Sequence, residues 1–183
     1  MKKKAIIILA DGFEEIEAIT VIDILRRAGI DVTICSLDSK EVKGSKGIPV
    51  VTDKILEGTE IEYDACVLPG GMPGAENLAS SGKVNKILLD MNKKGNIIAA
   101  ICAAPAVVLA PLGILDNRSA TCYPGMEENF SATTNYRKDD VVIDKNIITS
   151  QGPATALKFA IAITGKLCGQ VVAQKIADAT LLK

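Results

Sequence analysis

Apolar residues occur along this chain either as short unbroken runs or in sets spaced three and four positions apart. Unbroken runs bounded by turn residues predict buried strands, and sets with helical spacing predict amphipathic helices. The runs lie at residues 5–9, 32–35, 65–68 and 97–101, and helical spacing covers about 13–28 and 83–94. Strands that alternate with helices in this way indicate an α/β protein with a parallel sheet.

The remaining segments predict smaller elements at the edge of this sheet. Glycines separate short extended pieces over 41–51, which predicts a β-hairpin excursion of unknown function. A short strand is expected to run into a loop over 119–124, and 141–143 pairs with 147–149 as a hairpin. One helix should open at 151–153 and run to about 167, and a last helix should cover 170–177. With no repeat or linker, residues 1–183 are predicted to form one domain.

Cys102 lies directly after the predicted strand 97–101 and shortly before a helix that should begin near Pro105 and end before Gly113. A strand-to-helix turn presents its side chain at the carboxyl edge of the sheet, beside free N–H groups and the positive end of a helix dipole. We therefore expect this thiol to ionise more easily than an ordinary cysteine. A free cysteine can equally be a small buried hydrophobe, and this stretch alone leaves both interpretations open.

Glu17 occupies a position on its predicted helix where an apolar residue is expected. Val21 and Ile24 follow it by four and seven positions, so the carboxyl group falls on the apolar stripe, whereas Glu15 falls on the solvent side with Asp23 and two arginines. A buried carboxylate is costly without a partner. Either Glu17 only caps the helix, or its carboxyl group points to the sheet edge where Cys102 lies.

Gly70 and Gly71 follow the predicted strand 65–68 at once. Paired glycines let the backbone approach a ligand closely and offer N–H groups to an anion, although a simple turn explains them equally well. The stretch lacks the G-x-G-x-x-G pattern and the acidic residue of a dinucleotide site. We therefore expect no nucleotide cofactor here.

Composition and charge exclude several classes of function. The net charge is -1 and 48% of residues are hydrophobic, which is typical of a soluble globular protein with no nucleic-acid partner. The apolar run after Lys2-Lys3-Lys4 stops at Asp11, which is too short for a signal peptide, and no stretch is long enough to span a membrane. We expect neither a nucleic-acid nor a membrane partner.

The five cysteines are widely spaced and form no C-x-x-C pair, which argues against a zinc site and a disulfide framework. Reduced thiols in the cytoplasm are the better interpretation. The chain contains no histidine, which excludes a Cys–His or Ser–His nucleophile within the chain and any histidine-ligated metal. We expect the protein to use no metal and no cofactor.

Five motifs occur in order along the chain: ILADGFEEIE at 8–17, DILRRAG at 23–29, VLPGG at 67–71, AICAAP at 100–105 and TSQGPAT at 149–155. Together they resemble the ThiJ/PfpI superfamily, and specifically its DJ-one-like branch. The resemblance covers essentially the whole chain. It implies a flavodoxin-like, doubly wound, mostly parallel sheet sandwiched by helices, and a homodimer.

The resemblance also implies roles for individual residues. Cys102 corresponds to the nucleophilic cysteine of the family, and Glu17 to its acidic partner. The residues that it assigns to substrate and oxyanion binding are Gly70, Gly71, Ala103, Tyr123 and Pro153.

This sequence departs from its relatives at two positions. Several members carry a histidine in a Thr-x-His-Pro-like stretch, where this chain has Tyr123 before Pro124. Proton transfer then falls to Glu17, together with Tyr123 or water. In the PfpI protease branch a histidine directly follows the nucleophile, but Ala103 follows it here, so peptidase activity is not expected.

The activity that the resemblance implies is a cofactor-independent glyoxalase or deglycase acting on methylglyoxal and its early adducts. The Cys102 thiolate would form a hemithioacetal, and Glu17 would act as general acid and base. Because two adjacent negative charges repel, we expect the pair to share one proton, with Glu17 donating it to the thiolate.

Two other activities are possible from the residues. In a redox sensor or stress-responsive chaperone-like protein, Cys102 would be oxidised and turnover would be small. An amidotransferase-like hydrolase on a related fold is disfavoured by the missing histidine. Turnover of a dicarbonyl compound distinguishes the glyoxalase or deglycase from the redox sensor.

Overall fold

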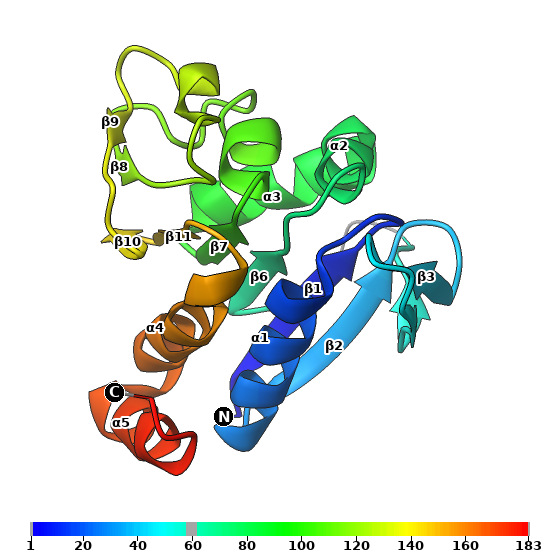
Figure 1. Ribbon diagram of the computed structural model, residues 1–183, viewed down its shortest axis with the longest axis vertical. Helices are drawn as coiled ribbons and strands as arrows, with labels where there is room; N and C mark the ends of the chain where they lie inside the picture. Colours follow the sequence, from blue (N-terminus) through cyan, green and yellow to red (C-terminus); the bar gives the residue numbers. More distant parts are fainter. Residues whose placement is uncertain (1, 58–61, 183) are drawn as a thin grey trace.

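Seven strands form the central sheet, in the order β10-β11-β7-β6-β1-β2-β5 (Figure 1). The structure, a computed structural model, describes residues 2–57 and 62–182. Neighbouring strands are parallel, except that β10 and β11 form an antiparallel hairpin as predicted. The strands are β1 (Lys4–Leu9), β2 (Asp31–Ser36), β5 (Lys54–Ile55), β6 (Ala65–Leu68), β7 (Ile97–Ile101), β10 (Val141–Asp144) and β11 (Ile147–Ser150). The expected doubly wound, mostly parallel sheet is confirmed.

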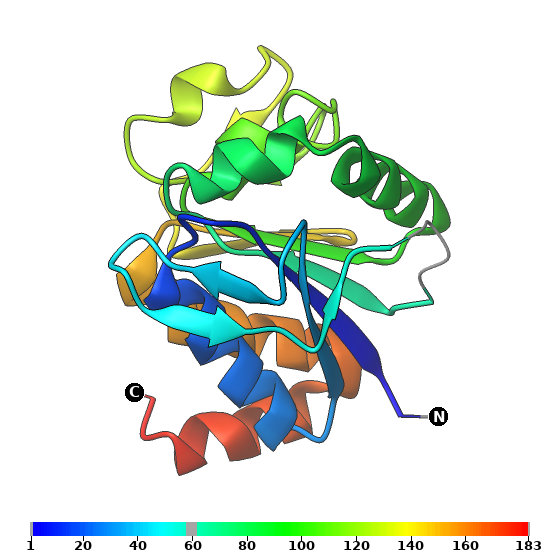
Figure 2. The same cartoon turned by 90° about the vertical axis from the view of Figure 1, so that its right-hand side faces the viewer.

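Helices cover both faces of the sheet (Figure 2). One face carries α1 (Glu15–Arg27), α4 (Ala156–Cys168) and α5 (Gln170–Ala179), and the other carries α2 (Gly74–Ser80), α3 (Gly82–Lys94) and the π-helical turn η1 (Pro105–Leu109). The chain passes from β1 to β2 on one side and then returns to β6 on the other side of β1. Open α/β sheets bind ligands at the carboxyl ends of the strands where the winding reverses in this way, here between β1 and β6.

The core explains why the unbroken apolar runs form strands. All four residues of β6 are buried, as are the five apolar residues of β1, because helices cover both faces of the sheet. The apolar stripe of α1, which includes Val21, Ile24 and Leu25, packs against the sheet. Burying a side chain of this size contributes about 1.5–3 kcal/mol, so these positions fix how α1 is rotated on the sheet.

Several predicted boundaries differ from those observed. The helix expected over 13–28 begins at Glu15, because Glu14 is its N-cap. The helix expected to reach Gly113 is the five-residue turn η1, whereas the short strand expected to run into a loop over 119–124 is present as β8 (Ser119–Ala120). A 3-10 turn, η3 (Pro153–Thr155), precedes α4, so that helix begins later than expected. The elements that the sequence did not predict are α2, β5, β9 (Asn135–Tyr136) and the 3-10 turn η2 (Glu127–Asn129).

The predicted excursion over 41–51 is an antiparallel hairpin of β3 (Glu41–Lys43) and β4 (Pro49–Val51), separate from the central sheet. Its turn packs on the first turn of α1 and covers Glu15 there. The expectation that Glu15 is solvated was therefore wrong, because Glu15 is only 6% exposed. Among the residues described, no helix combines the length and apolar character needed to cross a membrane.

Candidate active site

Cys102 lies in the turn between β7 and η1, at the carboxyl edge of the sheet, as the sequence predicted. Its φ is 63°, in the left-handed region that non-glycine residues rarely adopt. The Cys102 N–H donates to the carbonyl of Ser150 (2.9 Å), and the Cys102 carbonyl accepts from the N–H of Tyr123 (2.8 Å). The strained turn is thus held from two neighbouring segments, in the manner of a strand-to-helix elbow that presents a nucleophile.

Glu17 points from the first turn of α1 into the protein and is fully buried. Its Oε2 accepts a hydrogen bond from the N–H of Gly70 (2.8 Å), in the loop after β6. The helix is capped instead by Glu14, whose Oε2 accepts from the Glu17 N–H (2.8 Å). The interpretation of Glu17 as a mere helix cap is therefore wrong.

Gly70 is the point on which the site converges. A Cβ added there would lie 2.6 Å from the Cβ of Cys102, 2.9 Å from the N of Ala103 and 3.0 Å from Oε2 of Glu17. Non-bonded carbon atoms do not approach so closely without strain, so only glycine allows these groups to meet. Gly71 has a φ of 85°, and a Cβ on it would overlap the backbone of the loop before α1. The two glycines therefore let the loops after β1 and β6 pack against each other.

Burial controls the protonation of Glu17. It raises the pKa of Glu17 to about 7, against the hydrogen bond from Gly70 and the contact with Cys102, which both lower it. The nearby charge of Glu14 raises it slightly further. The proton affinity of Glu17 therefore lies close to neutrality, which is the range in which a general acid or base works best.

The Cys102 thiol is coupled to this carboxyl group. Burial, the Glu17 charge and the hydrogen bond to Glu17 raise the pKa of Cys102 to about 12, although the N–H groups of Gly71 and Ala103 lower it. The sequence predicted a lowered pKa for this thiol. That prediction was wrong, because the pKa of Cys102 is raised while Glu17 is charged. Taken together, the pair loses one proton near pH 7 and retains the second over a wide range above it.

The two Glu17 oxygens are not equivalent. Oε2 accepts the Gly70 N–H, whereas Oε1 is buried and has no hydrogen-bond partner among the described residues. A buried polar atom without a partner costs about 1–3 kcal/mol. Protonation of the carboxyl group removes its charge from this buried position and so lowers that cost.

The structure also places the other predicted site residues at this edge. The N–H groups of Gly71 and Ala103 face the Cys102 sulfur, whereas the Gly70 N–H is used by Glu17. The half-exposed ring of Tyr123 packs beside Gly152, where an added Cβ would lie 3.5 Å from the ring. Pro153 follows and begins η3. Tyr123 is thus tied to the Cys102 turn through its backbone, and Pro153 adjoins Gly152 in sequence, whereas the other five residues lie together around Gly70.

Sequence reasoning missed Glu14 and Ser150. Glu14 has a detectable signal, because an acidic side chain three residues before Glu17 has the spacing of a helix cap. Ser150 contributes through its backbone carbonyl, and no side-chain pattern predicts such a contact.

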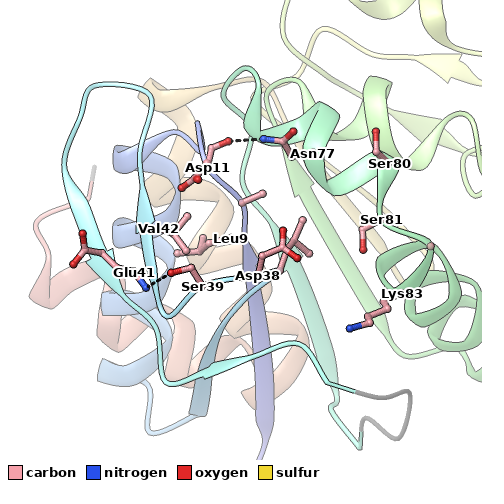
Figure 3. A pocket seen from close by; sticks show the side chains of 13 residues that line it. Leu9, Asp11, Asp38, Ser39, Glu41, Val42, Asn77, Ser80, Ser81 and Lys83 are labelled. Carbon is pink, nitrogen blue, oxygen red and sulfur yellow. Dashed lines mark hydrogen bonds between the residues drawn. The ribbon is translucent and has the colours of Figure 1, made fainter.

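A separate cleft of about 520 Å³ opens at the carboxyl ends of β1 and β2 (Figure 3). Its walls come from the end of β1, from β3 and from the connection between α2 and α3, and the amide of Asn77 donates to the carbonyl of Asp11 (2.9 Å) at its rim. None of the seven predicted site residues lines this cleft. In residues 2–57 and 62–182, no group of three or more Cys, Asp or Glu side chains is arranged to hold a metal ion.

Comparison with known proteins shows which family this chain resembles. A model of the DJ-1/PfpI family matches residues 3–166. The chain is 39% identical over 186 residues to the Parkinson disease protein 7 homolog of Danio rerio, which covers 99% of this chain and 98% of that protein. It is 36% identical over 170 residues to the glutathione-independent glyoxalase DJR-1.2 of Caenorhabditis elegans. That match covers 92% of this chain and 90% of the relative.

Solved structures give the same result. The structure of oxidized Toxoplasma gondii DJ-1 matches with a TM-score of 0.94 and 39% sequence identity, covering 98% of each chain. The similarity therefore extends over the sheet, both helical layers and the elements that carry Glu17 and Cys102.

Proposed function

Because this chain belongs to the DJ-1/PfpI family, we propose that it is a cofactor-independent, cysteine-dependent glyoxalase or deglycase. The observation that carries the proposal is the buried Glu17 carboxyl group, which Gly70 brings together with the Cys102 side chain at the sheet edge. The substrates are methylglyoxal and its early adducts with amines or thiols. A relative named as a glutathione-independent glyoxalase supports this substrate class.

In the reactive form of the pair, Glu17 holds the shared proton and Cys102 is a thiolate. Two N–H groups, from Gly71 and Ala103, face the sulfur, whereas the carboxyl group receives one N–H and has a free oxygen. These contacts favour negative charge on sulfur and a proton on Glu17. The thiolate is the form of cysteine that acts as a nucleophile.

The first step is addition. The Cys102 thiolate forms a C–S bond to the aldehyde carbon of methylglyoxal, and the carbonyl electron pair moves to oxygen. This oxygen takes the proton from Glu17, which leaves a hemithioacetal and a carboxylate. The N–H groups of Gly71 and Ala103 hold the developing oxyanion, and Gly70 contributes by orienting Glu17.

The second step moves a proton between adjacent carbons. The Glu17 carboxylate removes the hydrogen of the former aldehyde carbon as a proton, and an enediolate forms. Glu17 returns the proton to the neighbouring carbon, and the remaining hydroxyl proton moves to the neighbouring oxygen, which gives a lactoyl thioester of Cys102. One carbon is oxidised and its neighbour is reduced, so the step needs no external oxidant. Water then cleaves the thioester, which releases lactate and the thiol.

We assign Tyr123 and Pro153 to the substrate-binding part of the site, as the family resemblance implies. The Tyr123 N–H donates to the Cys102 carbonyl, and we assign its half-exposed ring, beside Gly152, to contact with the substrate or an attacking water molecule. It lies where several relatives have a histidine, so Glu17 carries the proton transfers in this chain.

A redox-sensing or chaperone-like role is the second candidate. A similar solved structure is named as an oxidized form, and the Cys102 side chain is 8% exposed, which allows access by a small oxidant. In this alternative Cys102 would be oxidised and dicarbonyl turnover would be small.

We further propose that the protein is a cytoplasmic homodimer. Ile16 and Ile19 of α1 and Ile48 of the hairpin turn are exposed, and Ile48 adjoins α1 because its N–H contacts Glu15 Oε1 (3.4 Å). An exposed apolar patch of this kind supports a subunit interface.

All five cysteines are free, which supports a reducing compartment.

The decisive experiment measures lactate formed from methylglyoxal by the purified protein without glutathione. We expect Cys102→Ser to reduce turnover to background. Cys66→Ser, in the buried strand β6, and Cys168→Ser, at the end of α4, should retain turnover because neither thiol belongs to the site.

Thermal melts of the same three variants provide the folding control. Equal loss of turnover in all three, together with lowered melting temperatures, would indicate damage to the fold instead of loss of a nucleophile. A wild-type protein that converts no dicarbonyl compound would refute the enzyme proposal and favour the redox-sensing role.

A further inference from the structure

Glu15 is a buried carboxylate that the proposed reaction does not use. It lies two residues before Glu17 on the first turn of α1. Its Oε1 accepts hydrogen bonds from the N–H groups of Lys46 (2.7 Å) and Ile48 (3.4 Å), and its Oε2 accepts one from the Ser45 hydroxyl (3.3 Å). All three donors belong to the turn between β3 and β4. A single carboxylate therefore organises the hairpin turn against the helix.

The turn is shaped to receive this charge. A Cβ added to Gly44 would overlap the carboxyl group of Glu15, so any other residue there would displace this group from its donors. Burial raises the pKa of Glu15, but the hydrogen bonds from the turn outweigh burial and lower it overall. Glu15 is thus held as a carboxylate, in contrast to Glu17.

The backbone fastens the same two segments together. The Gly12 N–H donates to the carbonyl of Lys43 (2.8 Å), and the Ser45 N–H donates to the carbonyl of Phe13 (2.8 Å). The Lys43 N–H donates to the Asp11 carboxylate (2.9 Å). Together with Glu15, these bonds attach the hairpin turn, residues 43–48, to the entire loop that leads into α1.

On its other side, this loop is bonded to the centre of the site. The Glu14 N–H donates to the carbonyl of Gly70 (2.9 Å), and the Gly70 N–H donates to Glu17 (2.8 Å). The first turn of α1 is therefore held between the hairpin turn and the loop that touches Cys102. Helix ends lack intrahelical partners and fray, so the direction of the Glu17 carboxyl group depends on these outside contacts.

We propose that Glu15 is a positioning residue for the Glu17–Cys102 pair: by fastening the hairpin turn to the first turn of α1, it fixes the direction of the Glu17 carboxyl group. The catalytic consequence rests on the proposed function, whereas the effect on the Cys102 thiol does not. Displacement of a catalytic group by about 1 Å can cost on the order of 100-fold in rate.

The test compares Glu15→Ala and Glu15→Gln with Asp64→Asn. Glutamine keeps a carbonyl acceptor for the Lys46 and Ile48 N–H groups, whereas alanine keeps none. Asp64 is a matched control, because its carboxylate also accepts a backbone N–H, that of Lys4 (2.8 Å), but at the opposite edge of the sheet. Each variant is assayed for kcat and KM with methylglyoxal. The rate of Cys102 alkylation by iodoacetamide is followed against pH by peptide mass spectrometry.

We expect Glu15→Ala to lower kcat about tenfold or more while KM changes little, and to displace the pH midpoint of Cys102 alkylation. Glu15→Gln should keep most of the wild-type kcat and a pH midpoint close to that of the wild type. Asp64→Asn should match the wild type in both quantities. If Glu15→Ala only lowers the melting temperature and keeps the wild-type kcat and alkylation profile, the proposal is wrong.

Two further outcomes remain informative. If the wild type has no turnover, the proposed function fails, and the alkylation profile alone decides the positioning role. If Glu15→Ala does not fold, Ser45→Ala removes only the hydroxyl bond to Oε2. A smaller displacement of the midpoint in the same direction then supports the proposal, and a wild-type profile contradicts it.

Discussion

Two acidic residues on one helical turn have opposite protonation behaviour in this protein. Glu15 receives three donors from the hairpin turn, and these lower its pKa in spite of burial. Glu17 receives one N–H, and burial raises its pKa to about 7. Deep burial with a single donor therefore makes Glu17 a group that can exchange a proton, whereas the donors of the hairpin turn keep the less deeply placed Glu15 charged.

Glu17 should make the stability of the protein depend on pH. Its pKa rises from 4.5 to about 7 on folding, so the folded state binds the proton more tightly. This stabilisation is fully present below about pH 4.5 and is lost as the pH rises through about 7. The difference corresponds to roughly 3 kcal/mol. In urea denaturation between pH 4 and pH 8.5, we expect the free energy of unfolding to fall by up to this amount relative to Glu17→Gln.

Glu17→Gln is the reference in this experiment because glutamine has nearly the same shape and does not titrate. Parallel curves of unfolding free energy against pH for the two proteins would show that folding does not change the proton affinity of Glu17.

For the helices and strands, the sequence predicted those features that depend on the local spacing of apolar residues. Helical spacing relative to Val21 and Ile24 placed Glu17 on the buried face of α1, and the apolar run before Cys102 placed that residue at the β7–η1 turn. The helix α2 was missed because it is short and follows the Pro-Gly-rich loop after β6, so turn residues dominate its pattern.

The errors concern contacts between elements. The helical phase of α1 places Glu15 toward solvent, and only docking of the hairpin turn buries it. The pKa of Cys102 was also predicted from its own turn, whereas the structure adds burial of the thiol and then the Glu17 carboxylate, which together reverse the direction of the shift. Neither effect has a signal in the spacing of residues within one segment.

For the whole molecule, the exposed residues Ile16, Ile19 and Ile48 predict a specific interface. We expect sedimentation equilibrium to give the mass of a dimer for the wild type and of a monomer for Ile16→Ser/Ile19→Ser. Leu89→Ser is the matched control, because Leu89 is equally an exposed apolar residue but lies on α3, on the opposite face of the sheet. A dimer that survives the double substitution, or that dissociates in Leu89→Ser, would contradict this interface.

The most direct test of the Glu17–Cys102 mechanism is the ultraviolet thiolate absorbance of Cys102 against pH, measured beside lactate formation in the wild type, Glu17→Gln and Glu17→Leu. If Glu17 holds the shared proton, the absorbance of one thiolate should appear near pH 7, where the pair loses its first proton, and should be missing in Cys102→Ser. Glu17→Gln should keep the thiolate but form no lactate, and Glu17→Leu should lose both. A wild-type thiolate that appears only near pH 12, or Glu17→Leu with an unchanged titration and activity, would contradict the mechanism.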